Sequence, residues 1–430
     1  MRRLVLILLL AACSGSPEQV AAPDLDAIAH RYVRLVLGMG QHDPDYVDAY
    51  YGPDSLKATA NRDSLALPAL RRGADSLLAE LGDAMPDGTD SMLVMRHRYL
   101  RTQLGALIIR TRMVGGEKLT FDQEARGLYG VDVPVYEPAR FDEQLARLDS
   151  LIPGPGALAT RYQRFRDRVM IPPARLDTVF KVAIAACRAR SGAHISLPPG
   201  ERFDLEYVKG TSWNAYNWYK GGSHSLIQVN TDFPTPVDRA IDLACHEGYP
   251  GHHVYNASLE RALVRDRGWV EMSVYPLFSP QSLIAEGSAN YGIDMAFPGG
   301  QRTTFERDTL FPLAGLDTSL AEQNAAVRVV MERLNHARNE VARQYLDGVV
   351  DGDSAKALMQ RWWLQTPEGA AKTLRFIDTY RSYVINYNLG RDMVARYVER
   401  NGGDDVARRW GVFGELLSSP RLPADLVAGP

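Results

Sequence analysis

The spacing of apolar residues restricts the fold of this chain more than any other feature of its sequence. In the segment DSMLVMRHRYLRTQLGALIIRTRMV, residues 90–114, apolar side chains recur every three or four positions. This spacing places them on one face of an α-helix. Similar segments fill most of residues 24–191 and resume after residue 235, separated by short turns that contain Pro and Gly. We therefore predict a mainly α, multi-helical protein.

One segment departs from this helical pattern. Residues 197–233 are rich in Tyr, Trp, Gly, Ser and Val, and apolar residues alternate with polar ones at 203–208 and 225–229. Such alternation is typical of β-strands. We expect one small antiparallel β-sheet of two or three strands within residues 200–232, placed directly before the next helix.

The length of the chain allows a large core. It has 430 residues, of which 45% are hydrophobic and 23% charged. We divide it into an N-terminal helical region, residues 24–196, and a second region, residues 197–430. The second region contains the sheet, central helices at 235–300 and C-terminal helices at 302–417. We expect the two regions to pack as one compact unit, and the net charge of −3 gives no reason to expect a nucleic-acid partner.

The first residues, MRRLVLILLLAACSGS, resemble a bacterial export signal. Two arginines precede the apolar run 4–10, which is too short to cross a bilayer as a mature helix. The string LAAC is similar to the lipobox, so we expect removal of residues 1–12 and a lipid anchor on Cys13. By resemblance to lipoprotein sorting, Ser14 favours the outer membrane, with the protein facing the periplasm. No later segment has 18 consecutive apolar residues, so we expect no transmembrane helix in the mature chain and membrane attachment through lipid alone.

Two other cysteines, Cys187 and Cys245, remain. Both lie in apolar helical contexts, AIAACRA and IDLACHE, which favours two small buried thiols. An exported chain also permits a disulfide bond between them.

The string HEGYPGHH, residues 246–253, contains three of the nine histidines beside Glu247. In the His-Glu-x-x-His motif of zinc peptidases, two histidines four residues apart reach one metal ion from the same face of a helix, and the Glu acts as general base. Here the second His lies six or seven positions after the first. On a regular helix these positions are about 120° around the axis or about 10.5 Å along it, so a regular helix cannot bring both histidines to one ion.

Pro250 and Gly251 supply the irregularity that this spacing requires. Pro250 has no N–H to donate to the carbonyl of His246, and its ring clashes with that carbonyl, so the helix must open. Gly251 gives the backbone the freedom to form a loop. Two residues bulged out of the helix would place His252 in the usual position of the second ligand. His253 is the alternative, and the histidine not used would support the site or face the substrate.

Two helix starts frame this region. Thr235 as N-cap, Pro236 at the first helical position and Asp238 completing a capping box predict a helix start just before the motif. Ser279 as N-cap and Pro280 at the first position predict another.

The second of these helices supplies the third ligand. Catalytic zinc takes three protein ligands and leaves one position for water. Glu286 lies on the inward face of this helix, and Gly287 and Ala289 beside it allow close approach of a neighbouring helix. We expect His246, His252 and Glu286 to bind one zinc ion per chain. Two imidazoles and a carboxylate suit zinc best, although cobalt, manganese or iron can use the same ligands.

The remaining roles follow from the chemistry of a hydrolase. Glu247 is the expected general base, and Tyr387 is the first candidate for a donor to the oxyanion, ahead of Tyr249 and Arg391. Trp213 and Tyr216 either line substrate subsites or simply pack on the sheet. The residues that we expect to orient a ligand or contact substrate are His253, Tyr249, Asn290, Asp294, Arg391, Trp213 and Tyr216.

These motifs carry a resemblance to known proteins. A His-Glu helix, a later His and a Glu on a following helix are similar to the gluzincin metallopeptidases, whose ligands are His, His and Glu. The chain more closely resembles, over nearly all of its mature length, a large bacterial family known as domain of unknown function 885. The strings that carry this likeness are HEGYPGHH, EGSANYG, HDPDYVDAYYGP, WNAYNWYKGG and YNLGR. The resemblance implies a zincin-like fold and a peptide substrate that pairs with the strand at 225–231.

We predict a zinc-dependent metallopeptidase of the bacterial cell envelope that hydrolyses small peptides. Two alternatives remain open. The first is a metallohydrolase that acts on an amide or ester other than a peptide. The second is a lipoprotein that binds a ligand without catalysis, although a pure binding site has no need of a general base such as Glu247.

Overall fold

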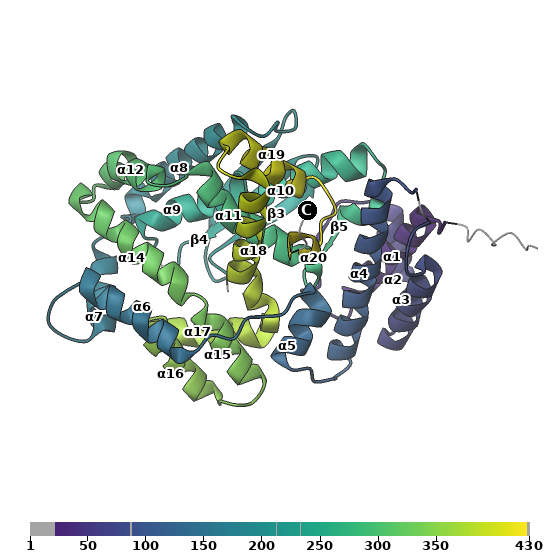
Figure 1. The fold of residues 1–430 in the computed structure, drawn as a ribbon, viewed down its shortest axis with the longest axis horizontal. Coiled ribbons are helices and arrows are strands. Elements are labelled where there is room, and N and C mark those ends of the chain that lie inside the picture. Colours follow the sequence, from purple (N-terminus) through teal and green to yellow (C-terminus); the bar gives the residue numbers. More distant parts are fainter. Residues whose placement is uncertain (1–21, 87, 212, 233, 428–430) are drawn as a thin grey trace, which may run out of the picture.

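The computed structural model describes residues 22–427 except 87, 212 and 233. The expected export signal and Cys13 lie outside the described residues. Helices dominate the structure, as predicted, and within these described residues they are accompanied by two small sheets (Figure 1). In the part of the chain that is described, no helix is both long enough and apolar enough to cross a bilayer.

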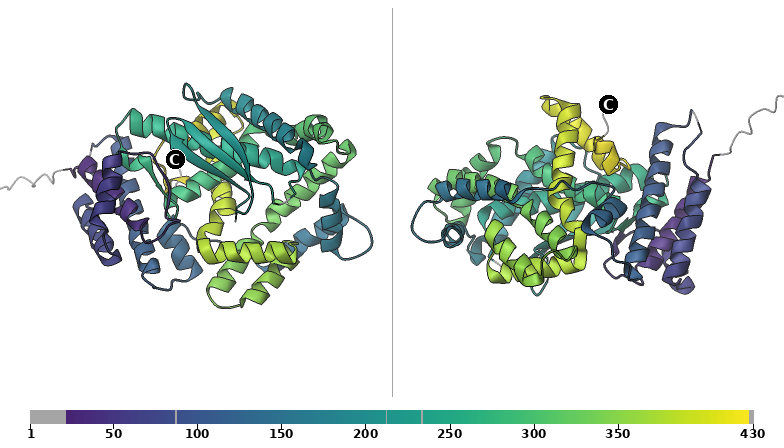
Figure 2. Two further views of the ribbon diagram at one scale, coloured as in Figure 1. Left: turned by 180° about the vertical axis from the view of Figure 1, so that it is seen from behind. Right: turned by 60° about the horizontal axis from the view of Figure 1, so that its bottom comes forward.

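Four N-terminal helices form a group at one end of the molecule, as both views in Figure 2 show. They are α1 (Leu25–Met39), α2 (Asp54–Asp63), α3 (Leu67–Leu81) and α4 (Ser91–Val114). Helix α4 is the segment in which the apolar spacing was clearest, and its Leu100, Leu104 and Leu107 are fully buried. It begins where Asp90 accepts hydrogen bonds from the backbone N–H groups of Met92 and Leu93, which satisfies two donors of the first turn.

The remaining helices lie around the central segment, residues 235–300, on several sides (Figure 1). Those that precede the large sheet are α5 (Phe121–Glu124), α6 (Pro138–Leu151), α7 (Leu158–Asp167) and α8 (Leu176–Gly192). Those of the C-terminal part are α12 (Gln301–Phe305), α13 (Phe311–Ala314), α14 (Ala321–Leu334), α15 (Ala337–Leu346), α16 (Gly352–Trp362), α17 (Pro367–Tyr380), α18 (Ile385–Gly402), α19 (Val406–Leu417) and α20 (Pro423–Val427).

The larger sheet has three strands, β2 (Arg202–Val208), β3 (Ala215–Gly221) and β4 (His224–Asn230), in the order β2-β4-β3. It lies on the face seen in the left view of Figure 2. Strands β3 and β4 form the expected antiparallel hairpin, but β2 pairs with β4 in parallel. The sheet is therefore mixed, because the hairpin folds back and inserts β4 between β3 and β2. Residue alternation along a strand does not specify this order.

A second sheet was not predicted. Strand β1 (Val47–Tyr50) pairs antiparallel with β5 (Val274–Pro276). These strands are too short for an alternating pattern to be recognised in the sequence. Their pairing joins the N-terminal region to the segment that precedes α11 (Pro280–Ala296).

The helix that carries the histidine motif is interrupted. Helix α9 (Val237–Leu243) continues into a wide π-helical turn (Ala244–Gly248), and a new helix, α10 (His252–Leu259), begins after residues 249–251. The predicted opening of the helix at Pro250 is thus confirmed.

The start of α9 differs from the prediction. The helix begins at Val237 with Pro236 as N-cap, one residue later than expected, and no capping box forms. The N–H of Val237 donates instead to the carbonyl of Val169, at 2.9 Å. Asp238 pairs with Arg166, at 3.1 Å. Tertiary contacts have therefore replaced the local cap.

Helices α11 and α18 cross at close range. A Cβ atom added to Gly287 would lie 2.5 Å from the backbone of Gly390, and one added to Gly390 would lie 2.7 Å from the carbonyl oxygen of Leu283. Neither glycine can be replaced without moving a helix. The predicted role of Gly287 in close helix approach is confirmed.

The expectation of two free thiols is wrong. Cys187 on α8 and Cys245 in the wide turn form a disulfide bond, with their Cα atoms 5.6 Å apart. Helix α8 packs against the wide turn, and this contact between segments 58 residues apart in the sequence is what brings the two cysteines together.

Candidate metal centre

The backbone after His246 explains how the unusual spacing brings two histidines together. In the wide turn the N–H of Tyr249 donates to the carbonyl of Ala244, at 3.3 Å, and the N–H of Gly251 donates to that of Cys245, at 2.9 Å. The peptide bond between Tyr249 and Pro250 is cis. The chain thus loops out and starts α10 at His252, which returns that residue to the side of His246.

Gly251 is essential to this path. A Cβ atom at this position would lie 1.8 Å from the carbonyl oxygen of His246 and 2.4 Å from that of Cys245. Since real Cβ atoms do not approach oxygen so closely, a residue with a side chain cannot occupy this backbone position. The glycine was predicted from its flexibility, but the structure requires it for lack of space.

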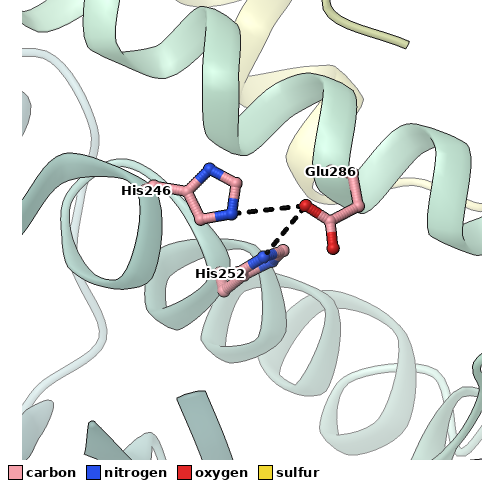
Figure 3. A group of neighbouring side chains, drawn as sticks. All are labelled: His246, His252 and Glu286. Carbon is pink, nitrogen blue, oxygen red and sulfur yellow. Dashed lines mark ion pairs between the residues drawn. The ribbon is translucent and has the colours of Figure 1, made fainter. Parts of the chain in front are cut away.

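His246, His252 and Glu286 lie together (Figure 3). Glu286 Oε2 is 3.3 Å from His246 Nε2 and 3.6 Å from His252 Nε2. The two imidazole rings are 4.6 Å apart and nearly perpendicular. Of the two adjacent histidines, His252 is the one beside His246 and Glu286.

The donor atoms of this cluster have the separation that one metal ion would require. Two ligand atoms bound tetrahedrally to zinc are about 3.4 Å apart, given zinc–ligand distances of about 2.0–2.2 Å. Glu286 Oε2 is buried and accepts no hydrogen bond, a costly state for a carboxylate oxygen unless a cation neutralises it. The residues present therefore fit a metal ion.

Asn290 orients the first histidine. Its Oδ1 is 3.1 Å from His246 Nδ1, so Nδ1 carries the hydrogen and the lone pair of Nε2 faces Glu286. The Asn290 side chain also donates to the backbone carbonyls of Glu286 and Tyr387. Asn290, expected either to orient a ligand or to contact substrate, lies beside His246.

The charges of the cluster favour an ionised carboxylate. Burial acts to raise the pKa of Glu286, but the charges of His252 and His246 outweigh it and hold that pKa well below its usual range. Burial acts to lower the pKa of His252, yet the charge of Glu286 raises it to about 9. Tyr383 donates a hydrogen bond to Glu286 Oε1, at 2.7 Å, and fixes the orientation of the carboxylate.

Glu247, the expected general base, is buried directly after His246 in the wide turn. Its backbone carbonyl accepts a hydrogen bond from the side chain of Asn217 on β3, at 2.7 Å. The charge of Glu247 acts on both His252 and Tyr387. The glutamate therefore lies close to the three candidate ligands.

His253 and Tyr249 form hydrogen bonds with residues outside the ligand cluster. His253 is fully buried, with Nδ1 2.8 Å from Ser225 Oγ and Nε2 3.0 Å from Glu201 Oε2. The hydroxyl of Tyr249 donates to the same Glu201 oxygen, at 2.6 Å. Burial acts to raise the pKa of Glu201, but these hydrogen bonds and those of Arg188 lower it to about 2. The hydroxyl of Tyr249, a candidate donor to the oxyanion, is thus occupied by Glu201, the residue directly before β2.

Asp294 and Arg391 lie elsewhere. They pair with each other, at 2.6 Å, and both line a cleft of about 480 Å³ whose lining includes none of the candidate ligands. The structure therefore does not bring Asp294 or Arg391 together with the candidate ligands. Asp294 comes two turns after Glu286 on α11, and Arg391 comes one turn after Tyr387 on α18. At about 5.4 Å per turn, these distances along the helices place both residues beyond the cluster.

Tyr387 lies within reach of the cluster. Burial raises its pKa well above the usual value, and the charges of Glu286 and Glu247 act in the same direction. Its ring packs edge to face against Tyr383, 5.8 Å away. Tyr383 was missed in the sequence, although its position four residues before Tyr387 is the spacing of one helix face.

Asp48 on β1 was also missed. Tyr216 donates a hydrogen bond to it, and burial raises its pKa to about 6. The charges of His252, Glu286 and Glu247 act on Asp48, so it lies near the cluster. The string HDPDYVDAYYGP drew attention to this segment, but only the pairing of β1 with β5 brings it here.

The two aromatic residues proposed to line subsites, Trp213 and Tyr216, lie next to each other. The hydroxyl of Tyr216 donates a hydrogen bond to Asp48, and its ring is 5.7 Å from that of Trp213.

The expectation that a peptide pairs with the strand at 225–231 is wrong, because β4 is the central strand and both of its edges are already paired. Strand β3 is an edge strand of this sheet and touches the wide turn.

Comparisons with known proteins show the fold alone. No family model matches the chain, and no curated protein matches it. The chain resembles the solved structure of the "putative lipoprotein from Colwellia psychrerythraea", with a TM-score of 0.52 and 14% identity over 86% of this chain and 70% of that one. Weaker likenesses are to a "putative lipoprotein of unknown function from Shewanella oneidensis" (TM-score 0.43, 11% identity, 84% and 75% covered) and to "M32 carboxypeptidase from Deinococcus radiodurans R1" (TM-score 0.40, 13% identity, 94% and 92% covered). The first of these likenesses shows a shared fold, and the resemblance to the domain of unknown function 885 family stays a prediction.

Proposed function

We propose that this protein is a zinc-dependent metallopeptidase in which His246, His252 and Glu286 bind one zinc ion. The observation that carries the proposal is Glu286 Oε2, which is buried without a hydrogen-bond donor and lies 3.3 and 3.6 Å from two imidazole nitrogens. Three such ligands leave a fourth position open, as in catalytic rather than structural zinc sites.

Each neighbouring residue has a role in this reaction. When bound, zinc supplies a Lewis acid that polarises the scissile carbonyl and lowers the pKa of water. Glu247 takes the proton from the attacking water and delivers it to the leaving amine. Tyr387 donates a hydrogen bond to the oxyanion that develops on the carbonyl. Asn290 and Tyr383 hold His246 and Glu286 in place.

A peptide is the substrate class that we favour. Strand β3 contacts the wide turn, and one of its edges pairs with no other strand in the described part of the chain. An extended peptide can add to this edge as a further strand. The export signal and Cys13, both outside the described residues, support a lipid-anchored position in the bacterial cell envelope, at the outer membrane and facing the periplasm.

The substitution Glu247→Gln tests this function. It removes the base without removing a ligand, so we expect about one zinc per chain and a decrease in kcat of about 10²- to 10⁴-fold on any peptide that the wild type cleaves. Elemental mass spectrometry measures the zinc, and chromatography of a digested peptide library measures the cleavage. His246→Ala is the matched control and should lose the zinc.

Two results would contradict the proposal. One is a wild-type protein that binds no zinc after zinc is added back. The other is a Glu247→Gln variant that cleaves peptides at the wild-type rate.

A further inference from the structure

Arg338, near the start of α15, is a half-buried cation without a carboxylate partner among the described residues. Its Nη2 donates to the carbonyl of Val384, at 3.3 Å, while its Nε is buried and has no acceptor. No ion pair joins Arg338 to an aspartate or glutamate among the residues that the structure describes. One of its five N–H donors thus has an acceptor in the protein.

Few arginines of the described structure share this state; Arg421 is another whose buried Nε has no acceptor. Other buried arginines each have a carboxylate: Arg96 pairs with Glu271, Arg110 with Asp43, Arg166 with Asp238 and Arg302 with Asp242 and Glu306. A guanidinium that is partly removed from water without a counter-charge is unfavourable. The partner of Arg338 is therefore expected to come from outside the protein.

Arg338 lies beside the candidate metal centre. Its guanidinium is 5.0 Å from the centre of the Tyr387 ring and 5.4 Å from that of Trp363. Burial lowers the pKa of Arg338, and the charge of Glu286 is near enough to oppose this change. The Tyr387 ring that Arg338 contacts also packs against Tyr383, which donates a hydrogen bond to Glu286.

The two aromatic rings leave the guanidinium able to bind an anion. Contacts with ring faces stabilise the cation without using its N–H donors. The free donors of an arginine match the two oxygens of a carboxylate, which they bind as a pair. A short peptide carries one carboxylate at a fixed place, its C-terminus.

We propose that Arg338 binds the C-terminal carboxylate of the substrate, which makes the protein a carboxypeptidase that removes residues from the C-terminal end of short peptides. This inference rests on the proposed metallopeptidase function and adds to it the direction of cleavage. Tyr387, which contacts Arg338, would lie beside the last peptide bond.

Matched peptides test the inference with the wild-type protein. One short peptide is compared in three forms: with both ends free, with an amidated C-terminus, and with an acetylated N-terminus. We expect amidation to lower kcat/KM at least about 100-fold, the size of effect seen when one partner of a buried charge pair is removed. Acetylation should leave kcat/KM within about twofold, and mass spectrometry should identify the C-terminal residue as the released product.

Variants then assign the effect to Arg338. Arg338→Met should keep its zinc and bring the rates on free and amidated peptides to within about threefold of each other. Arg338→Lys should keep part of the preference, because lysine retains the charge but not the paired donors. Arg333→Met removes an exposed arginine of the preceding helix α14 and should keep the full preference.

The outcomes separate this inference from the function on which it rests. A wild-type protein that binds zinc and cleaves amidated and free peptides equally well would overturn the role of Arg338 and leave the metallopeptidase standing. The role of Arg338 would also be overturned, and the metallopeptidase would stand, in two other cases. One is a protein that cleaves only peptides with a free N-terminus. The other is a protein that recognises an acidic side chain of the peptide and not its C-terminal carboxylate. A protein with neither zinc nor peptidase activity would overturn both. If Arg338→Met fails to fold, the wild-type rates on the three peptides still show whether the protein recognises a C-terminal carboxylate.

Discussion

Adjacent residues in this protein have different tasks, and His252 and His253 are the clearest example. Successive side chains on a helix point about 100° apart. His252 therefore faces His246 and Glu286, whereas His253 contacts Ser225 and Glu201 on the opposite side. Sequence alone could not separate the two, because the size of the loop between Glu247 and α10 decides which histidine turns inward.

Alanine substitution of each histidine should give opposite results. His252→Ala removes a ligand, so we expect loss of zinc with little change in the stability of the zinc-free protein. His253→Ala leaves buried hydrogen-bond partners unsatisfied and should lower the free energy of unfolding by about 1–3 kcal/mol, with zinc retained. Zinc content and urea unfolding in the presence of a chelator measure the two effects. Loss of zinc in the His253 variant alone would show that the ligand assignment is reversed.

At the scale of elements, the site depends on a break in a helix. The wide turn and residues 249–251 replace regular helical geometry and set the position of α10 relative to α9. The crossing of α11 and α18 at Gly287 then places Glu286 against both histidines. Spacing rules predicted the break and the close crossing, since both follow from the backbone chemistry of proline and glycine.

Gly251→Ala should disrupt the site without unfolding the protein. The added Cβ would overlap the carbonyl oxygens of His246 and Cys245, so the chain must shift and the two histidines must separate. We expect zinc affinity to fall at least about tenfold, as when the support of a metal ligand is removed. Competition with a fluorescent chelator measures this change.

The control for this substitution is Gly105→Ala in α4. No atom lies within 4 Å of the added Cβ, and alanine favours helix, so this variant should be more stable by about 0.4–1 kcal/mol with unchanged zinc affinity. Equal zinc affinity in the two variants would show that Gly251 is not required for the site.

At the scale of the whole molecule, segments far apart in the sequence contact the elements that carry the histidine motif, which are α9, the wide turn and α10. The disulfide bond ties α8 to the wide turn, and β1 brings Asp48 to the cluster. Beneath α9, Arg302 forms buried ion pairs with Asp242 and Glu306. Residues from both sides of the division that we drew at residue 197 thus meet at the site.

Arg302→Met should destabilise the protein in a pH-dependent manner. Burial acts to raise the pKa of Asp242, but Arg302 and its neighbours lower it to about 2. This pairing therefore stabilises the fold above the usual Asp pKa of about 3.9, and the stabilisation is lost as the pH falls toward 2. At pH 7 the variant should lose about 3–5 kcal/mol, because charged carboxylates stay buried without a partner.

The difference between the wild type and Arg302→Met should decrease as the pH falls. Without Arg302 the pKa of Asp242 rises, so the folded variant takes up a proton that the folded wild type does not. Urea unfolding of both proteins at pH 7, 5 and 4 measures this trend. A difference that grows toward low pH would contradict the assigned role of Arg302.

The sequence determined the features that arise from local spacing and backbone chemistry. The helical character, the small sheet, the opening at Pro250 and the close crossing at Gly287 all follow from residues a few positions apart. Tertiary structure alone decided the bond between Cys187 and Cys245, the strand order β2-β4-β3, and the positions of Asp48, Tyr383 and Arg338 near the cluster. The physical reason is that these features depend on contacts between distant segments, whose relative placement is set by the packing of the entire core and not by the residues that meet there.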